Sequence, residues 1–376
     1  MTILYVIKYI AQLGGLDRVM AFKMNWLAQH GYKVHLVTYE QRDHSISFPL
    51  DPSISHTDID VKLWKKEGRT VVQRWISYQR LRRLFAKRMR AEVERIQPDV
   101  LVTLTDSYQV IDLLMNIPTT ALRIVESHVE RKAFMKVGDF KGNPVMRWLA
   151  GIYDRRMSRY IQRADSLVLL TQQDKAQWSE VKHTVVIPNP LTYIPTRLST
   201  LDNKIVMAAG RLHDQKGFDL LIQAWQTVHD AEPDWQLHIY GDGPNREQLQ
   251  QQIDANQLSG SVSLLPATND IFAAYSEASI FCLSSRYEGY GLVLAEAMSC
   301  GVPCVSFDCP YGPSDIIRDH QDGLLIPNGD TNALAQGLLS LMQDSKLRHT
   351  YGAAARNNIM RYSPDNIMPL WKTLFT

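Results

Sequence analysis

A glycine-containing turn between an apolar run and a helical run does most to constrain the fold of this chain. Residues 284–305 read SSRYEGYGLVLAEAMSCGVPCV. The apolar run ASIFCL leads into a turn that holds Glu288, Gly289 and Gly291, and the helical run LVLAEAMS follows. A second apolar run begins after Pro303. This order predicts a strand, a glycine loop, a helix and a strand, which is the repeating unit of a parallel α/β sheet.

The same turn has the composition of an anion-binding site. N–H groups at a helix N-terminus lack partners within the helix and carry partial positive charge, which suits a phosphate. Glu288 precedes the turn and Glu296 lies on the helix, so a Glu-x7-Glu pair flanks it. The N–H groups would bind a diphosphate, and the carboxylates would bind ring and ribose hydroxyls. Because such turns occur in every doubly wound protein, the interpretation depends on a second segment.

Length and composition favour a soluble protein of two domains. The chain has 376 residues, of which 45% are hydrophobic and 21% are charged. No apolar run is long enough to span a membrane. The start, MTILYVIKYI, is interrupted by Lys8 and is typical of a buried strand rather than a signal peptide.

The cysteines indicate a reducing compartment. All of them have apolar neighbours in one C-terminal region, and none forms a Cys-x2-Cys pair. They are Cys282, Cys300, Cys304 and Cys309. We expect buried free thiols rather than disulfides or zinc ligands.

The net charge of +2 conceals two oppositely charged halves. Residues 1–190 hold 29 Lys and Arg against 19 Asp and Glu, a net charge of +10, and the remainder has a net charge of −8. This asymmetry predicts two domains with different partners.

Strand and helix patterns alternate along both halves, which predicts two doubly wound units. A helix over 15–30 carries Leu16, Val19, Met20, Lys23 and Leu27 at helical spacing. The prolines of 185–204 mark the connection between the units. The predicted parts are an acceptor-binding domain 1–190, a linker 191–204, a nucleotide-sugar domain 205–360 and a C-terminal helix 361–376 that returns to the first domain. We expect ligands beyond the carboxyl ends of the strands, in a cleft between the domains.

Two cations in one strand-to-helix loop form the second segment. In KIVMAAGRLHDQKGFDLLIQAW, Arg211 follows a strand and Lys216 precedes a helix. Arg can bind a phosphate bidentately and Lys adds a point charge, so together they could hold a diphosphate without a metal. The alternative is an ordinary solvated loop.

These motifs together resemble glycosyltransferase family 4, whose members are retaining, nucleotide-sugar-dependent enzymes of the GT-B fold. The resemblance covers most of the chain. The motifs follow the family's order: GGLDRV at Gly14 and Gly15, IPNP, GRLHDQKG, IYGDGP, the Glu-x7-Glu segment and CPYGPSDII. The family often has Phe at Tyr290, Pro at Val293 and Glu at Asp17. These departures leave the identity of the sugar open.

The resemblance implies a role for each matching residue. Arg211 and Lys216 bind the leaving diphosphate, Glu288 contacts the transferred sugar, and Glu296 binds the ribose. His128, in IVESHVE, contacts the donor sugar. The residues that face or line the donor with backbone groups are Gly14, Gly15, Gly289, Tyr290, Gly291 and Leu292.

No metal or other cofactor is expected. Asp58-Ile-Asp60 looks like the Asp-x-Asp of the other large transferase architecture, but it lies outside the nucleotide-binding half. We expect these carboxylates to be solvated. Cations and a helix N-terminus can stabilise the leaving group instead.

A basic helix over 70–96 suggests contact with a membrane. Its apolar stripe is Val71, Trp75, Tyr78, Phe85, Met89, Val93 and Ile96. Cations surround it, and the membrane-surface candidates are Arg74, Arg82, Arg83, Lys87 and Arg88. Such a helix can lie on anionic lipid. The alternatives are a helix that covers the N-terminal sheet, which is less favoured, and a nucleic-acid site, which is least favoured because no recognised module appears.

We therefore expect a retaining glycosyltransferase at the inner face of the cytoplasmic membrane, attached peripherally. It would move a hexose or N-acetylhexosamine from a nucleotide sugar, a UDP-sugar by preference, to a hydroxyl of a lipid-linked glycan or glycolipid in polysaccharide synthesis. The alternatives are a GT-B sugar-nucleotide epimerase, a soluble disaccharide synthase and a non-catalytic sugar-nucleotide-binding regulatory subunit. No nucleic-acid partner is expected.

Overall fold

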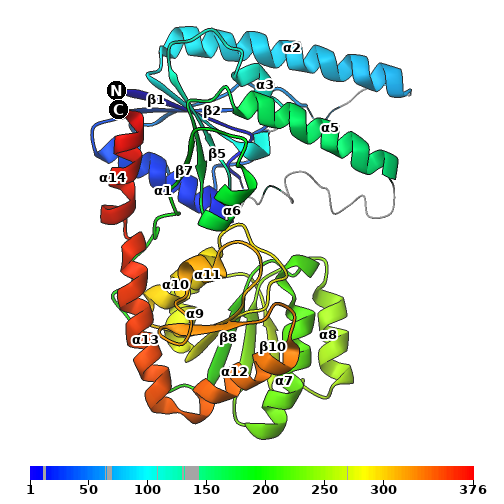
Figure 1. Cartoon of the computed structure of the whole chain (residues 1–376), viewed down its shortest axis with the longest axis vertical. Helices are drawn as coiled ribbons and strands as arrows, with labels where there is room; N and C mark the ends of the chain where they lie inside the picture. Colours follow the sequence, from blue (N-terminus) through cyan, green and yellow to red (C-terminus); the bar gives the residue numbers. More distant parts are fainter. Residues whose placement is uncertain are drawn as a thin grey trace. The chain divides into compact units, whose positions relative to one another are not determined.

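The chain forms two compact α/β units (Figure 1). The computed structural model describes residues 1–11, 14–63, 65, 70–107, 109–128, 131, 144–268 and 270–376. One unit comprises Met1–Pro188 with Met368–Thr376, and the other comprises Asn189–Ile367. The sequence predicted a first domain that ends at 190 and a returning helix over 361–376. In the structure, the segment that groups with the first unit begins at Met368.

A parallel sheet of seven strands organises the first unit, in the order β3-β2-β1-β4-β5-β6-β7. Its strands are β1 (Thr2–Ile7), β2 (Lys33–Thr38), β3 (Ser55–Asp58), β4 (Val100–Leu104), β5 (Leu122–Glu126), β6 (Ser166–Leu169) and β7 (Thr184–Val186). The register places Ile3 opposite Val34 on one side and Val100 on the other. The strand order therefore reverses between β1 and β4, where open sheets bind ligands.

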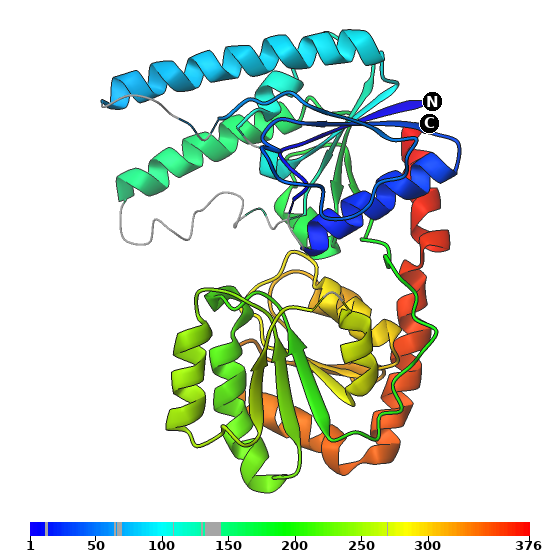
Figure 2. The same cartoon turned by 180° about the vertical axis from the view of Figure 1, so that it is seen from behind.

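Helices cover both faces of this sheet. They are α1 (Gly15–Gln29), α2 (Val71–Ile96), α3 (Ile111–Leu114), α5 (Pro144–Ile161) and α6 (Gln172–Gln177), with the short turn η1 (Thr105–Ser107). The side chain of Thr70 accepts from the N–H of Gln73 and closes a capping box at the start of α2. Figures 1 and 2 show the N-terminal part of α2 extending beyond the sheet.

The second unit has a parallel sheet of six strands in the order β10-β9-β8-β11-β12-β13. Its strands are β8 (Ile205–Ala209), β9 (Gln236–Tyr240), β10 (Val262–Leu265), β11 (Ile280–Leu283), β12 (Cys304–Phe307) and β13 (Gly323–Ile326). Its helices are η3 (Asp214–Lys216), α7 (Phe218–Ala231), α8 (Arg246–Ala255), α9 (Ile271–Glu277), α10 (Leu292–Ser299), α11 (Pro313–Ile316), α12 (Thr331–Gln343), α13 (Ser345–Ile359) and η4 (Met360–Tyr362).

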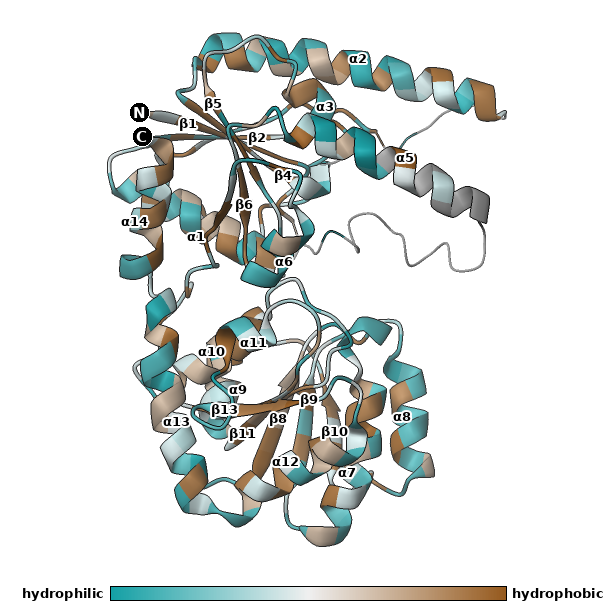
Figure 3. Ribbon diagram, viewed as in Figure 1, coloured by the Kyte–Doolittle hydropathy of each residue, from teal (hydrophilic) through white to brown (hydrophobic). Residues whose placement is uncertain are grey.

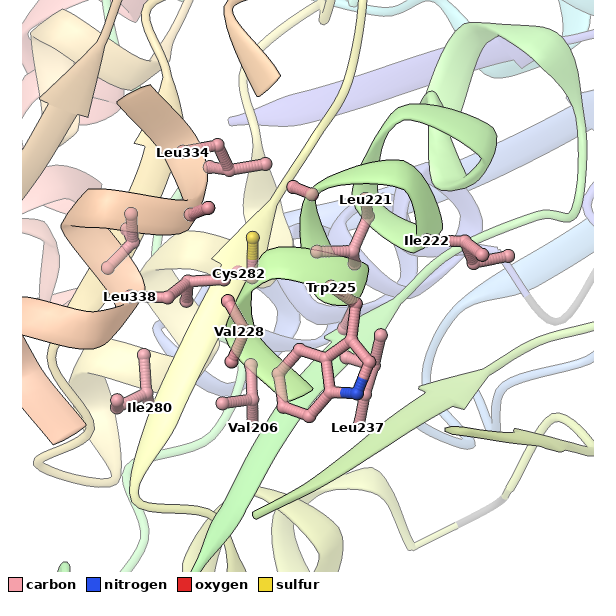
Figure 4. Close-up of a cluster of buried hydrophobic side chains, with 14 of the residues drawn as sticks. Val206, Leu221, Ile222, Trp225, Val228, Leu237, Ile280, Cys282, Leu334 and Leu338 are labelled. Carbon is pink, nitrogen blue, oxygen red and sulfur yellow. The ribbon is translucent and has the colours of Figure 1, made fainter. Parts of the chain in front are cut away.

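Trp225 of α7 lies in the core of the second unit (Figure 4). It is fully buried in one cluster with Val206, Leu237 and Ile280, and its indole N–H donates to Ser261 Oγ at 3.3 Å. Most strands are apolar, with the edge strand β3 (SHTD) as an exception, and most helices carry both apolar and polar residues (Figure 3). This pattern is the near-continuous apolar strand expected of a sheet covered on both faces. All four cysteines are buried and free, as predicted.

The last helix, α14 (Pro364–Phe375), joins the first unit through its second half. Trp371 and Phe375 are buried, and the ring of Phe375 meets Tyr32 edge-on at 6.0 Å between centroids. Figure 2 shows the two ends of the chain close together in this unit. None of the described helices is both long and apolar enough to cross a membrane.

Candidate functional site

Both motifs of the second unit lie where its strand order reverses. β8 and β11 are neighbours in the sheet, although two other strands separate them in the sequence. The loop with Arg211 and Lys216 follows β8, and the turn with Glu288 and Gly291 follows β11. Ligands of open parallel sheets bind beyond the carboxyl ends of the strands at such a point. The tertiary structure therefore brings the two motifs to one edge of the sheet.

Two glycines allow close packing of the loop after β8, one against the end of β11 and one within the loop itself. A Cβ atom on Gly217, whose φ is +60°, would lie 2.1 Å from the carbonyl oxygen of Ser284. A Cβ atom on Gly210 would lie 3.0 Å from Cε of Lys216, so the lysine stem lies across the backbone of Gly210. Ser284 Oγ donates to the carbonyl of Lys216 at 2.9 Å. These contacts fix the position of the lysine.

Lys216 and Glu288 form an ion pair. Nζ of Lys216 lies 2.6 Å from Oε1 of Glu288, and Ser285 Oγ donates to the same oxygen at 2.5 Å. Glu288 is only 6% exposed, and a buried carboxylate needs such partners because leaving it unpaired is strongly destabilising. The sequence predicted separate roles for the two residues, on the diphosphate and on the sugar. In the structure they form an ion pair with each other.

Arg211 differs from Lys216 in its surroundings. Its side chain is exposed, and its guanidinium makes no hydrogen bond or ion pair with any residue in the described ranges. Such a cation can bind an anion from solution without first breaking an ion pair within the protein. Arg211 is therefore the more accessible of the two predicted phosphate ligands.

Arg286, which no sequence motif singled out, ties the two loops together. Its guanidinium donates to both carboxylate oxygens of Asp219 at 2.8 and 2.7 Å, and to the carbonyl of Asp214 at 2.8 Å. Hydrogen bonds from Arg286 hold the pKa of the Asp219 carboxyl below its ordinary value. The sequence shows a basic residue two positions before Glu288, but it does not show that Asp219 on α7 would be its partner.

The glycine turn opens α10 as predicted from the sequence. Gly291 has a φ of +90° and precedes the first residue of the helix, Leu292. A Cβ atom on Gly312 would lie 1.9 Å from the carbonyl oxygen of Tyr290, so the loop after β12 packs closely on the turn. The side chain of Tyr290 is buried, so only backbone groups at this position could face a ligand. Gly289 beside it is partly exposed.

Glu296 lies within α10 and contacts another helix of its own unit. Tyr275 of α9 donates its hydroxyl to Oε2 of Glu296 at 3.0 Å, and Glu296 is 6% exposed. The carboxylate is thereby oriented by a phenol.

The predicted residues of the first unit follow β1 and β5. Gly14 has an extended backbone and precedes Gly15, the first residue of α1. A Cβ atom on Gly14 would meet no atom within 4 Å. His128 follows β5, and its Nε2 lies 3.0 Å from Oε2 of Glu126, with 7% of its side chain exposed.

Two of the proposed membrane-surface cations make contacts within the chain. Arg82 forms an ion pair with Asp112 and donates to the carbonyl of Gln109. Arg88 donates to the carbonyls of Ile59 and Asp60. Both side chains therefore hold α2 against its neighbours. The remaining candidates, Arg74, Arg83 and Lys87, are exposed.

The apolar stripe on α2 does not form one exposed surface. Phe85, Met89 and Val93 are buried in the core of the unit, so this part of the predicted stripe covers the sheet and cannot lie on lipid. Val71 and Trp75, from the same stripe, lie beyond the sheet and are 84% and 62% exposed. The physical reason is that α2 is longer than the sheet that its apolar side covers.

Asp58 and Asp60 lie among cations. They line a hollow together with a third carboxylate, Asp43, and with Arg42, Lys62 and Lys65. Asp58 Oδ1 accepts from Thr38 Oγ1 at 3.2 Å, and Asp60 lies 3.4 Å from Lys62 Nζ. Within the described parts of the chain, no group of three or more His, Cys, Asp or Glu side chains is arranged to hold a metal ion.

The second unit matches a family model. Residues 194–358 match the model of the family described as "Glycosyl transferases group 1". Over nearly its whole length the chain is also 28% identical to an uncharacterized glycosyltransferase of Haemophilus influenzae, and the alignment of 372 residues covers 98% of each chain.

More distant relatives carry descriptions of what they act on. One is an N-acetylgalactosamine-N,N'-diacetylbacillosaminyl-diphospho-undecaprenol 4-alpha-N-acetylgalactosaminyltransferase of Campylobacter jejuni, 30% identical over 156 residues and 42% of each chain.

The structure resembles an S. aureus TarM variant in complex with Fondaparinux, alpha-GlcNAc-glycerol and UDP, with a TM-score of 0.76, 17% identity and full coverage of both chains. This likeness shows that the fold is GT-B, as predicted.

Proposed function

Because residues 194–358 match the model of the group 1 glycosyltransferase family, we propose that the protein is a retaining glycosyltransferase that uses a nucleotide sugar. Its donor is a UDP-sugar, and the group transferred is a hexose or an N-acetylhexosamine. The acceptor is a hydroxyl of a lipid-linked glycan or glycolipid in cell-envelope glycan synthesis. The observation that carries this proposal is the Lys216–Glu288 pair beside the N-terminus of α10.

The diphosphate of the donor would bind at the edge of the sheet formed by β8 and β11. Arg211 supplies an accessible cation, Lys216 a partly buried one, and α10 the N–H groups of its first turn. Charge builds up on the leaving diphosphate as the glycosidic bond breaks. Fixed cations and dipoles already aimed at that charge stabilise the transition state without reorganising. No metal is needed in this mechanism.

The paired carboxylate would orient the sugar. Glu288 accepts from Lys216 and Ser285 through Oε1, which leaves Oε2 as the oxygen for a sugar hydroxyl. Glu296, held by Tyr275, would accept from the ribose. As the family resemblance implies, the leaving phosphate oxygen takes the acceptor's proton on the same face of the sugar. The protein's part is then positioning and charge stabilisation.

A lipid-linked acceptor would be met at a membrane surface. The Campylobacter relative is named for a diphospho-undecaprenol acceptor, which supports this class. On α2, Val72, Ile76, Arg80, Arg83 and Lys87 recur at spacings of three and four residues and are all exposed, so they share one face of the helix. We propose that this face, named here the basic face of α2, docks on anionic lipid at the inner side of the cytoplasmic membrane.

The decisive experiment is a panel of donors and acceptors read by mass spectrometry. Purified protein is incubated with UDP- and GDP-sugars and a membrane lipid extract. The masses of the products are measured before and after digestion with glycosidases. Transfer from a UDP-sugar to an extractable lipid supports the proposal. An acceptor-independent change of the donor would identify an epimerase, and transfer to a free sugar or sugar phosphate would identify a soluble synthase. Binding of UDP-sugars without any turnover would identify a regulatory subunit.

A further inference from the structure

A buried lysine in the first unit forms an ion pair with the carboxylate that contacts His128. Lys23 of α1 is 1% exposed, and its Nζ lies 2.5 Å from Oε2 of Glu126 at the end of β5. The same oxygen lies 3.0 Å from Nε2 of His128. Lys23 Nζ also lies 3.4 Å from the centroid of the Trp371 ring, on α14. Four elements of the chain, α1, β5, the loop after β5 and α14, therefore contribute to one buried network.

Burial makes this pair costly as a purely structural device. Removing two charges from water costs more than their attraction returns in many proteins, and well-packed apolar residues often serve as well. Lys23 lies on the helix face that otherwise carries Val19, Met20 and Leu27, where an apolar residue would continue the stripe. Glu126 has one oxygen, Oε1, with no hydrogen-bond partner in the described structure. The feature that an apolar pair could not reproduce is the contact with His128.

The charges around His128 favour an ionised Glu126. Burial alone would raise the pKa of the Glu126 carboxyl, but the Lys23 ammonium and the imidazole together hold it below its ordinary value. An ionised carboxylate can only accept hydrogen bonds. A neutral imidazole beside it must therefore carry its proton on Nε2, which leaves Nδ1 with a lone pair. Among the described residues, the His128 ring is hydrogen-bonded through Nε2 alone.

We propose that Glu126 is a positioning residue that fixes His128 as the Nε2–H tautomer, so that Nδ1 accepts a hydrogen bond from a hydroxyl of the transferred sugar. Lys23 is the counter-charge that keeps Glu126 ionised inside the unit, and the Trp371 ring covers that ammonium. The inference rests on the proposed function for the identity of the ligand. The tautomer itself does not depend on that function.

The test replaces the charged pair by an apolar one. In Lys23→Met/Glu126→Leu no unpaired charge remains, so the variant is expected to fold with a thermal midpoint near that of the wild type. Lys23→Arg keeps the cation, and Met24→Leu is a matched conservative change at the next buried position of α1. The protein is labelled with 15N at histidine, and the His128 ring signals are assigned by their loss in His128→Gln.

The wild type, Lys23→Arg and Met24→Leu are expected to show a single Nε2–H tautomer at His128. The apolar double variant is expected to show a mixture, together with a fall of about tenfold or more in kcat and little change in the donor KM. A folded double variant with an unchanged tautomer would overturn the proposal. If the double variant does not fold, Lys23→Met/Glu126→Gln replaces it. Its amide can donate or accept, so a mixture is again expected and a single tautomer again overturns the proposal.

The ring spectra separate this inference from the proposed function. If the wild type transfers no sugar to any acceptor, the function fails while the spectra still decide the role of Glu126. If transfer is found but the wild-type ring is already a mixture of tautomers, the positioning role fails and the function stands.

Discussion

Nζ of Lys216 lies 2.6 Å from Oε1 of Glu288, although the two residues follow strands that are not consecutive in the chain. The pair has two consequences for a donor. The lysine is held in place before a diphosphate arrives, and its charge is partly compensated by the carboxylate. The two cations of the loop after β8 should therefore respond differently to substitution.

We predict that Arg211→Ala weakens UDP binding without changing stability, whereas Lys216→Ala weakens both. Each loses a charge-assisted hydrogen bond, worth about 1.5–3 kcal/mol or roughly 10- to 150-fold in Kd. Lys216→Ala also leaves Glu288 buried beside one hydroxyl. Titration calorimetry with UDP and thermal unfolding measure the two effects, with Lys204→Ala, from an exposed pair, as the control. Unchanged UDP and GDP affinity in both folded variants would remove these residues from the diphosphate site.

The two glutamates are predicted to separate turnover from nucleotide affinity. Glu288→Gln should lower kcat while UDP still binds, because the amide cannot replace the carboxylate that orients the sugar. Glu296→Ala should lower UDP affinity. Since it also removes the partner of the Tyr275 hydroxyl, Tyr275→Phe is the matched control that loses the same hydrogen bond but keeps the carboxylate. Wild-type turnover by Glu288→Gln at saturating donor would contradict the role of Glu288.

Transfer is predicted to continue in excess EDTA. Arg211, Lys216 and the N-terminus of α10 supply the charge stabilisation that a divalent ion would otherwise give. Asp58→Asn/Asp60→Asn should likewise keep the wild-type rate, because these carboxylates lie beside cations. The mechanism would be wrong if EDTA abolished activity and manganese or magnesium restored it.

The basic face of α2 is predicted to bind anionic vesicles. Reversing Arg80, Arg83 and Lys87 to Glu should weaken binding about 100-fold or more, at roughly 1 kcal/mol for each cation. Arg82 is left intact because a carboxylate there would oppose Asp112. Vesicle sedimentation with phosphatidylglycerol measures the effect, added salt should weaken the wild type, and UDP affinity should not change. Equal binding by both proteins would make α2 a helix that only covers the sheet.

Asp174 is predicted to make the first unit less stable as the pH rises from about 4 to 7. Burial raises the pKa of its carboxyl from the ordinary 3.8 to about 6. The unfolded chain therefore loses this proton at a lower pH than the folded chain does. The free energy of unfolding falls by up to about 3 kcal/mol by the time the pH has risen through 6. Asp174→Asn keeps the backbone N–H that donates to Thr171 Oγ1 but has no charge. Its thermal midpoint should rise relative to the wild type over this range. If the difference in thermal midpoint between Asp174→Asn and the wild type did not vary with pH, ionisation of Asp174 would not be its cause.

Sequence periodicity predicted most of the local structure correctly. Apolar runs marked the strands, and Gly291 marked the start of α10, because only glycine readily adopts its φ of +90°. Arg211, Lys216 and Glu288 were identified from the loops that follow the strands. These features depend on neighbours in the chain, which the sequence displays directly.

The sequence by itself thus determined which residues end strands, open helices and carry charge at the candidate site. Only the tertiary structure decided which of them meet. Lys23 read as part of an apolar helix face, and nothing near it in the chain identified Glu126 or Trp371 as its partners. Likewise the stripe on α2 divided into the buried Phe85 and the exposed Trp75 where the sheet ended. The physical reason is that contacts between non-consecutive elements depend on strand order and on the extent of the sheet, which local periodicity does not encode.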